Sequence, residues 1–266
     1  MLWSRGDLGL LDRPTVAIVG TRRATAYAER VTRQLAGTLA RAGATVISGL
    51  ARGVDAAAHR GALEADGGTV AVLGTGLDVC YPRAHASLQR EIGERGLLLS
   101  ELAPHDAAHP GSFPRRNRII AALARVTVVV EAGVKSGALI TAGHAADLGR
   151  TVAALPGPID VPGAAGTNAL LRDGAHLVAS VDDVLALAGC TPTHAATSTD
   201  GAPPAAPPGL APDERALWDA LGAPASGADA LVERTGLPVR RCITALTALE
   251  LAGLVESRWS GEIARR

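Results

Sequence analysis

Short, largely apolar runs alternate with helix-like stretches from Thr15 to about Ala188, and this rhythm constrains the fold more than any other feature. The runs do not alternate polar with apolar side chains, so both faces of each are expected to be covered. They occupy residues 15–20, 44–48, 69–73, 97–101, 126–130 and 151–156. Buried strands that take turns with helices predict an α/β fold, a wound parallel sheet with helices on both faces.

The composition requires an aliphatic core, because hydrophobic residues make up 47% of the chain but aromatic residues only 2%. Small and branched side chains suit helices that pack closely on a parallel sheet. We expect helices over 24–41, from the turn at 49–53 to residue 65, and over 86–95. Residues 1–14 are expected to form a short lead-in segment, in which Leu2 and Trp3 cover a sheet edge. Residues 15–187 are expected to form one Rossmann-like domain.

The first strand is not followed by the glycine pattern of a dinucleotide-binding fold. After Gly20 the chain continues with Thr21, Arg22 and Arg23, where that pattern needs a second glycine so that a pyrophosphate can approach the backbone. A later Gly-Thr-Gly at 74–76 lacks the third small residue at its proper spacing. We therefore expect no cofactor.

Positive charge is concentrated between Gly111 and Gly143, in a chain whose formal net charge is +0. The cations of this stretch, opposed by one acid, are Arg115, Arg116, Arg118, Arg125 and Lys135. They precede two expected helices on either side of the strand at 126–130. Such junctions meet at the carboxyl edge of a parallel sheet, where helix N-termini offer N–H groups to anions. The stretch predicts a phosphate site, unless its arginines lie on a solvated helix face.

Two residues that occur once in the chain fall in this stretch. Phe113 is the only phenylalanine, and its ring could stack a base between phosphate contacts or could fill a loop pocket. Lys135, the only lysine, places a compact point charge beside Ser136 and Gly137.

The remaining polar residues that could carry chemistry are expected to have structural roles. Asp55 and His59 lie four apart and could pair or bind a metal, but a hydrogen bond on the helix surface is the favoured interpretation. Glu131 is expected to orient Lys135 or Arg118. No serine has a histidine partner at a recognisable spacing, so we expect neither a catalytic nor a metal site.

The cysteines Cys80, Cys190 and Cys242 are odd in number and far apart, and they support neither a disulfide framework nor a zinc site. The N-terminus lacks the pattern of a signal peptide, and no apolar run reaches about 18 residues. The expected location is the cytoplasm, without membrane contact.

The composition changes at residues 188–209, which are rich in proline and alanine and predict a disordered linker. Residues 210–266 show helix-like patterns at 214–221, 227–236 and 238–253, and then a possible hairpin. This order is that of a winged helix. Its arginines do not outnumber its acids, so a role in protein contact is at least as well supported as DNA reading.

Several long motifs in register identify a family. They read VAIVGTRRAT, VISGLARGVDAAAH, VAVLGTGLDVCYP, FPRRNRIIAAL, VVVEAGVKSGALITA and PG…GTNALLRDGA. In order and spacing they resemble the DNA-processing protein A (DprA/Smf) family over residues 16–187, and the tail is similar to that family's winged helix. Many members carry a helical domain before the lead-in. The chain is thus either a short form or one with a misassigned start, and any function of that domain stays open.

The resemblance implies a domain that binds single-stranded DNA, forms a homodimer and loads the RecA recombinase onto strands taken up in natural transformation. It implies no enzymatic activity. Phe113 would be the base stacker, and the remaining pocket residues carried over are Arg22, Ser48, Gly49, Arg52, Gly53, Arg115, Asn117, Arg118, Lys135, Ser136 and Gly137.

The main alternative is a phosphoribohydrolase that acts on nucleoside monophosphates. Residues 162–170 are similar to the PGGxGTxxE motif of the enzymes called lysine-decarboxylase-like proteins. Leu170 stands where those enzymes need a glutamate, and an aliphatic side chain can neither accept a proton nor stabilise a cation. The alternative is therefore disfavoured.

Overall fold

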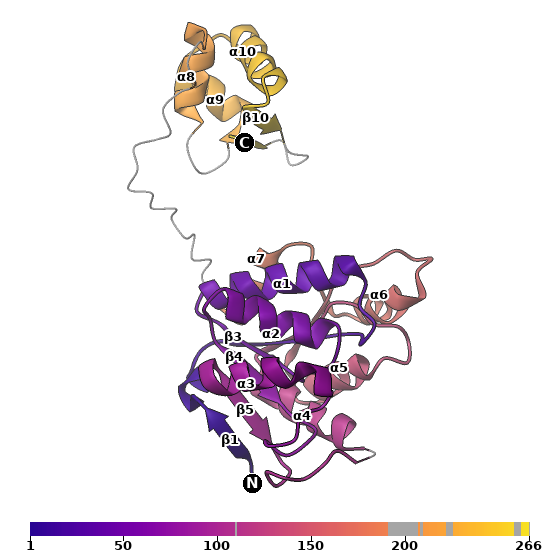
Figure 1. The fold of residues 1–266 in the computed structure, drawn as a ribbon. Helices are drawn as coiled ribbons and strands as arrows, with labels where there is room; N and C mark the ends of the chain where they lie inside the picture. The colour runs from indigo at the N-terminus through magenta and orange to yellow at the C-terminus, as the bar shows by residue number, and fades with distance from the viewer. Residues whose placement is uncertain (110, 191–206, 208–209, 222–225, 258–261, 266) are drawn as a thin grey trace. The chain divides into compact units, whose positions relative to one another are not determined.

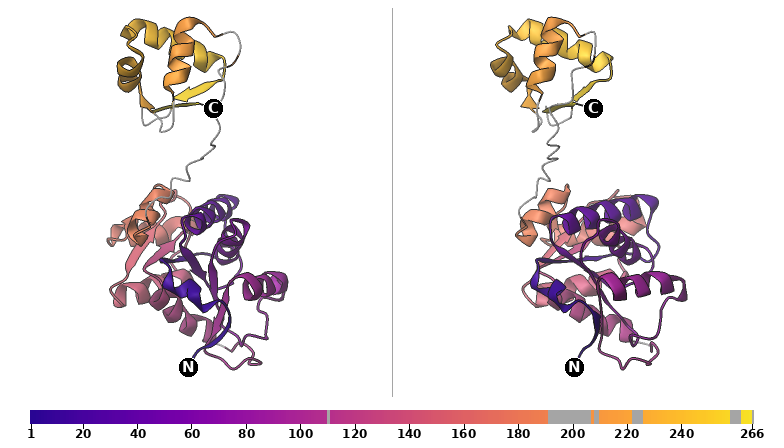
Figure 2. Two further views of the ribbon diagram at one scale, coloured as in Figure 1. Left: turned by 90° about the vertical axis from the view of Figure 1, so that its left-hand side faces the viewer. Right: turned by 60° about the vertical axis from the view of Figure 1, so that its left-hand side comes forward.

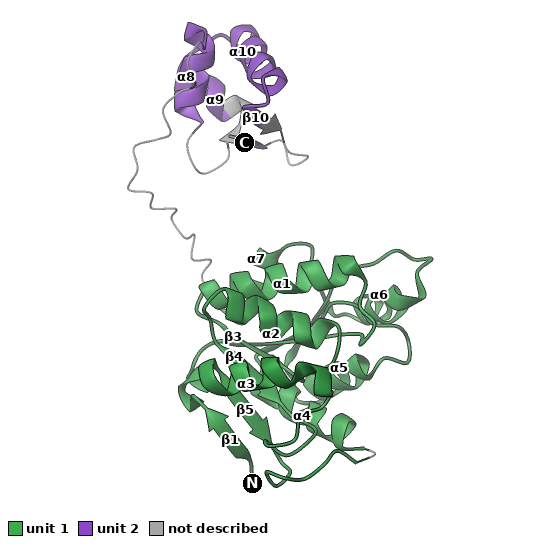
Figure 3. Cartoon of the chain, viewed as in Figure 1, with its two compact units in different colours: residues 1–194 green, residues 195–266 purple. Residues whose placement is uncertain are grey.

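The computed structural model describes residues 1–109, 111–190, 207, 210–221, 226–257 and 262–265. The chain divides into two compact units, residues 1–194 and 195–266, and each is described by itself (Figure 3). Most of the predicted linker, 188–209, lies outside the described residues, and the domain boundaries proposed from the sequence stay predictions.

The first unit is built on one mixed sheet whose strands follow the order β1-β5-β4-β3-β2-β6-β7-β8 (Figure 1). Seven of these strands are parallel, which confirms the predicted α/β class. They are β2 (Thr15–Val19), β3 (Thr45–Ser48), β4 (Thr69–Val72), β5 (Leu97–Ser100), β6 (Val126–Val129), β7 (Thr151–Ala154) and the short β8 (His176–Leu177).

The lead-in covers the edge of the parallel strands by joining the sheet as a strand of its own. β1 (Trp3–Gly6) pairs antiparallel with β5, so that Trp3 lies opposite Ser100. The Arg5 side chain ties β1 to the loop after β4: its Nη2 donates a hydrogen bond to the Asp78 carboxylate at 2.5 Å. That hydrogen bond is the main reason why the pKa of Asp78 lies below its usual value.

Helices cover both faces of the sheet, and their apolar residues divide into clusters according to the face (Figures 1 and 2). One face carries α1 (Ala26–Arg41), α2 (Val54–Glu64), α3 (Ala86–Arg95) and α7 (Val181–Ala188). The other carries α4 (Ser112–Leu123) and α5 (Gly137–Asp147). α6 (Ala165–Arg172) follows β7 and contacts it.

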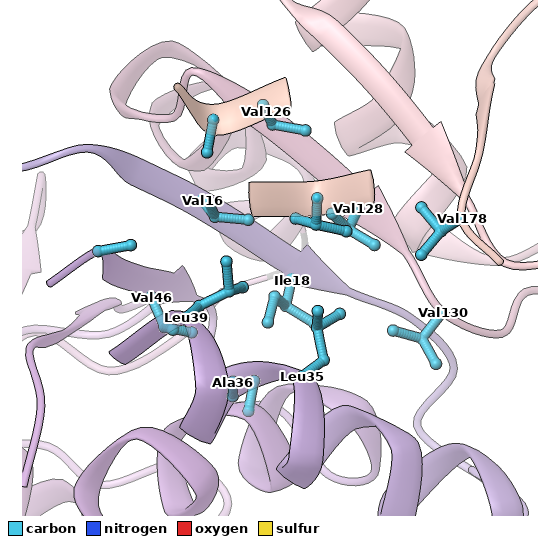
Figure 4. Close-up of a cluster of buried hydrophobic side chains, with 14 of the residues drawn as sticks. Val16, Ile18, Leu35, Ala36, Leu39, Val46, Val126, Val128, Val130 and Val178 are labelled. Carbon is cyan, nitrogen blue, oxygen red and sulfur yellow. The ribbon is translucent and has the colours of Figure 1, made fainter. Parts of the chain in front are cut away.

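The core is aliphatic, as the composition requires. Figure 4 shows Ile18 of β2 and Val128 of β6 packed with Leu35 and Leu39 of α1, and all four side chains are almost wholly excluded from solvent. The next residues along β2, Ala17 and Val19, belong to the cluster on the opposite face. A central strand apolar on both faces is therefore what two helical layers require.

The strand order reverses beside β2. The chain proceeds from β2 through β3 and β4 to β5 on one side, and then crosses to β6 on the other. Consecutive crossovers thus leave in opposite directions from β2 and β6, and the loops at their carboxyl ends part to form a crevice, where open α/β sheets bind ligands.

The second unit contains the expected three helices followed by a hairpin. Its helices are α8 (Pro212–Ala220), α9 (Ala228–Thr235) and α10 (Val239–Leu251), and its strands are β9 (Ser226–Gly227), β10 (Val255–Ser257) and β11 (Glu262–Arg265). Leu217, Leu231 and Leu249 meet in its core. No helix in the described part of either unit is long and apolar enough to cross a membrane.

Candidate functional site

A cavity of about 470 Å³ opens where the strand order reverses. Its walls come from the loop after β2, which includes Arg22, from α4 with Phe113 and Asn117, and from the turn before α5 with Lys135. Residues predicted from three separate sequence motifs are therefore brought together at one edge of the sheet.

A second cavity of about 230 Å³ adjoins the first. Both are lined by Arg22, Arg23, Ala51, Phe113 and Arg116. The smaller cavity adds Arg52 from the loop after β3 and Tyr81 from the loop before α3. We call the two cavities together the rim groove.

Arg116 forms the floor of the rim groove. It is 6% exposed, and its guanidinium donates to the carbonyl oxygen of Gly49 at 2.5 Å and to that of Val72. A carboxylate oxygen of Asp55 lies 3.9 Å from its Nη2. Arg116 belongs to the predicted cluster of cations but was not among the predicted site residues, because nothing in a run of arginines indicates which member is buried.

Burial affects the pKa of both charged groups. Desolvation lowers the pKa of Arg116 to about 10, against the opposing effect of Asp55. Desolvation likewise raises the pKa of Asp55, although Arg116 and backbone N–H groups favour its charged form. Arg116 still titrates well above neutrality, so it contributes positive potential from beneath the groove.

The loops that carry the predicted cations are locked to one another. Gly53 has φ +70°, and a Cβ there would lie 2.4 Å from the carbonyl oxygen of Thr21, so only glycine fits this close approach. The N–H of Val54, at the start of α2, donates to the same oxygen at 3.3 Å. The loops after β2 and β3, with Arg22 and Arg52, are thereby held side by side.

The N-terminus of α5 lies at the wall of the larger cavity. The Ser136 hydroxyl caps the helix by accepting from the N–H of Ala138 at 3.3 Å. Asn117 on α4 donates from Nδ2 to the carbonyl oxygen of Gly137 at 3.3 Å and ties the two helices together. Lys135 directly precedes this helix, so its charge adds to the partial positive charge of the helix end.

Besides Gly53, three predicted residues line neither cavity: Arg115, Arg118 and Ser48. Arg115 and Arg118 are on the side of α4 that faces Glu101: Arg118 donates to Glu101 Oε1, and Arg115 Nε lies 3.6 Å from Oε2. They flank the rim groove instead of lining it. Ser48 is fully buried, and its hydroxyl donates to the carbonyl oxygen of Ile18 at 2.6 Å.

Phe113 is packed more tightly than an isolated stacking residue. The Arg22 guanidinium carbon lies over its ring, 5.6 Å from the centroid. A Cβ at Gly74 would lie 2.5 Å from the Phe113 ring. The Tyr81 ring is its neighbour, with centroids 5.1 Å apart and planes inclined by 40°. Tyr81 was not among the predicted site residues, although it lies within the motif VAVLGTGLDVCYP and is one of six aromatic residues in the chain.

The expectations for the remaining acids and for His59 need correction. Asp55 and His59 do not pair on a helix surface: both are buried, Asp55 faces Arg116, and His59 Nδ1 shares a hydrogen bond with the Thr69 hydroxyl at 2.7 Å. Glu131 orients neither Lys135 nor Arg118 but accepts from the Thr25 hydroxyl at 2.6 Å, at the N-cap of α1. The described residues contain no group of three or more side chains suited to a metal ion.

The segment similar to the phosphoribohydrolase motif serves the scaffold. Leu170, in place of the catalytic glutamate, packs against the core cluster beneath α5. The Asn168 side chain makes two hydrogen bonds with the backbone of Gly157. Its Oδ1 accepts from the N–H at 3.1 Å, and its Nδ2 donates to the carbonyl oxygen at 2.9 Å. Neither residue lines the rim groove.

Comparison with known proteins agrees with this geometry. Residues 1–189 match the family described as DNA recombination-mediator protein A, and residues 201–259 match the DprA winged helix domain. The putative DNA processing protein DprA of Mycobacterium tuberculosis is 42% identical over 97% of this chain and 67% of its own length. Protein Smf of Escherichia coli is 38% identical over 100% of this chain and 71% of its own.

Solved structures give the same result. DprA from Streptococcus pneumoniae superposes with a TM-score of 0.67 at 44% identity, covering 70% of this chain and 65% of that one. DprA from Helicobacter pylori, whose structure describes a single-stranded DNA binding mode, gives a TM-score of 0.64 at 37% identity, covering 70% and 85%. The chain spans about two thirds of the length of several of these relatives. It belongs to the DNA recombination-mediator protein A family.

Proposed function

We propose that the protein binds single-stranded DNA along the rim groove. Arg22, Arg52 and Lys135 come from three different loops, and Arg116 adds charge from below. This convergence of cations and helix N-termini at one sheet edge is the observation that carries the proposal, because it presents several donors to successive phosphates. Single strands are preferred because the adjoining aromatic rings can stack only with unpaired bases.

We propose a separate role for each group of site residues. Arg22, Asn117, Lys135, Ser136 and Gly137 bind in the larger cavity, and Arg52 binds in the smaller one. Ser48, Gly49 and Gly53 shape the loops, while Arg115 and Arg118 attract the strand from the flank. Phe113 supports the aromatic wall between the cavities.

The wider cellular role that we propose is based on the family to which the chain belongs. We propose that the protein protects incoming single strands in the cytoplasm and loads RecA onto them during natural transformation or recombination, as a homodimer formed through the first unit. Membership of the recombination-mediator family supports this role. No catalytic step is proposed.

Fluorescence-anisotropy titrations with single- and double-stranded oligonucleotides across a salt series test the binding site. Arg22→Ala combined with Lys135→Ala should weaken single-strand binding at least tenfold and reduce the slope of log affinity against log salt by about 1.4, since each lost phosphate contact removes about 0.7. Arg60→Ala combined with Arg90→Ala is the matched control. Both arginines are exposed, on α2 and α3, and replacing them removes the same charge outside the rim groove. Equal effects of the two pairs would disprove the rim groove as the binding site.

Incubation with nucleoside monophosphates tests the disfavoured enzyme. Leu170 leaves the motif without its carboxylate, so no free base should be released above the uncatalysed rate. Release at an enzymatic rate would replace the proposal with that of a phosphoribohydrolase.

A further inference from the structure

We propose that His85 is a positioning residue for DNA binding: its imidazole holds the turn after β3 in the conformation that presents Arg52 to a bound strand. This inference rests on the proposed binding of single-stranded DNA and deepens it. His85 ends a short 3-10 helix, Arg83–His85, and lines neither cavity of the rim groove. It therefore acts through the turn and not by contact with the strand.

The turn after β3 contains a backbone conformation that its sequence does not favour. Leu50 has φ +57°, in the left-handed region, where a side chain crowds the backbone and glycine is the usual residue. The Leu50 side chain is fully buried, in an apolar cluster with Leu73 and Leu88. Aliphatic contacts of this kind keep the side chain in place but do not orient the peptide group that follows it. Such a conformation persists only where the surroundings hold it.

The peptide group between Leu50 and Ala51 is held at both of its polar ends. His85 Nδ1 lies 3.0 Å from the carbonyl oxygen of Leu50, and the N–H of Ala51 donates to Asp55 Oδ2 at 3.3 Å. A carbonyl oxygen can only accept, so Nδ1 of His85 carries the proton. We call this pair of hydrogen bonds the peptide clamp. Rotation of the peptide group would break both bonds and leave the Leu50 carbonyl oxygen buried without a donor.

His85 is itself fixed in the structure. It is 7% exposed, and its backbone N–H donates to the carbonyl oxygen of Pro82 at 2.9 Å. A side chain enclosed in this way presents its donor from one position. The peptide clamp thus joins the segment before α3 to the turn after β3.

The clamped peptide group directly precedes the part of the turn that reaches the rim groove. Ala51 lines both cavities, and Arg52 lines the smaller one. Arg52 is exposed, so its direction is set by the backbone from which it projects. The close approach of Gly53 to Thr21 fixes the other end of the turn. Arg52 therefore starts from a defined place, and less conformational freedom is lost when it meets a phosphate.

The competing interpretation is that His85 only stabilises the fold. A residue of that kind lowers the affinity, if at all, to the same extent whether or not Arg52 is present. A positioning residue acts through Arg52, so replacing it should have no further effect once Arg52 has been replaced. The coupling between the two positions in a double-mutant cycle distinguishes these interpretations.

Anisotropy titrations of the full chain with an oligothymidylate test the peptide clamp. His85→Phe keeps a ring but removes the donor. It should weaken binding by about fivefold and lower the slope of log affinity against log salt by up to about 0.7, the share of one phosphate contact. His85→Asn should bind within about twofold of the wild type, because its amide can donate to the same carbonyl oxygen. In a chain that carries Arg52→Ala, His85→Phe should change the affinity by less than about twofold.

Gln89→Leu is the matched control. Gln89 is also 7% exposed, and its Nε2 donates to the carbonyl oxygen of Leu77 at 3.0 Å. The variant therefore removes a comparable buried hydrogen bond from the same region without touching the turn after β3. It should lower the stability and leave the affinity and the salt slope unchanged. An equal loss of affinity in Gln89→Leu and His85→Phe would show that general loosening, and not the clamp, weakens binding.

The outcomes separate the two proposals. Undiminished binding by His85→Phe, or an equal loss with and without Arg52, would overturn the peptide clamp and leave the rim groove to the Arg22 and Lys135 variants. Failure of the wild-type chain to bind any single strand would overturn both. If His85→Phe does not fold, heteronuclear NMR of the histidine side chains in the wild type decides the matter: His85 should carry a proton on Nδ1, and a proton on Nε2 alone would refute the hydrogen bond to Leu50.

Discussion

Arg116 illustrates how one residue can serve both stability and binding. Its guanidinium donates to the carbonyl oxygen of Gly49, just after β3, and to that of Val72, the last residue of β4, and its charge is opposed by Asp55. A buried guanidinium is tolerable because its planar fork can satisfy several acceptors at once.

Replacing Arg116 with methionine should lower the free energy of unfolding by about 3–5 kcal/mol, because the buried Asp55 carboxyl would lose its counterion and the Gly49 and Val72 carbonyl oxygens would lose their donor. Adding Asp55→Asn should recover part of this loss. Urea titrations of the wild type, both single variants and the double variant measure the coupling between the residues. Additive losses would show that the 3.9 Å pair contributes nothing.

His59 predicts a dependence of stability on pH. Burial, Arg116 and His85 lower the pKa of His59 from 6.5 to about 3, and its Nε2 has no hydrogen-bond partner among the described residues. Between these values the unfolded chain binds a proton that the folded chain does not. The stability contributed by neutral His59 is therefore complete above pH 6.5 and is lost as the pH falls towards 3.

The expected slope is about 1.4 kcal/mol per pH unit below the unfolded pKa. Asp55 works in the opposite sense, because its raised pKa makes the folded state bind a proton first. Urea titrations from pH 7 to pH 5 should show a smaller pH dependence for His59→Asn than for the wild type. Identical curves would mean that His59 is accessible to protons in the folded state.

At the scale of elements, α4 presents two different polar sides. Phe113, Arg116 and Asn117 face the rim groove, while Arg115 and Arg118 face Glu101 on the loop after β5. The apolar stripe that includes Ile119 and Ile120 must pack on the sheet, and this fixes the rotation of α4 about its axis. The rotation in turn decides which polar side chains face the rim groove and which face Glu101.

Glu101→Gln should free Arg115 and Arg118 beside the groove and raise the affinity for single-stranded DNA by a few fold at low salt, with little gain at high salt. The folded state should lose no more than about 1 kcal/mol, because the arginine side chains of both ion pairs are well exposed to solvent and glutamine can still accept a hydrogen bond. Anisotropy at two salt concentrations measures the gain. An unchanged or lower affinity would contradict the flanking role of the two arginines.

The sequence predicted elements better than it predicted the direction of side chains. Apolar runs such as 15–20 and 126–130 predict the central strands because burial on both faces leaves few other folds. It could not predict that Ser48 points into the sheet or that Glu131 bonds Thr25, because both depend on the rotation of one element against another. Tyr81 was missed because its loop reaches Phe113 only in the folded chain.

At the scale of the whole molecule, the two units have separate cores, and all residues assigned to the rim groove belong to the first. A chain that ends near Ala188 should therefore fold and bind oligothymidylate with an affinity within about threefold of the full chain, with the same salt slope. Anisotropy on both forms tests this. A large loss in the shorter form, with its circular dichroism intact, would assign part of the binding to the winged helix.

The concentration of cations at the rim groove affects how a DNA strand approaches the protein. The whole chain carries a formal net charge of +0, so the field of a distant polynucleotide mainly orients the protein and attracts it only weakly. Attraction begins once the basic border faces the strand at close range, within about one Debye length. Added salt should thus shorten the lifetime of the complex far more than it slows the first encounter.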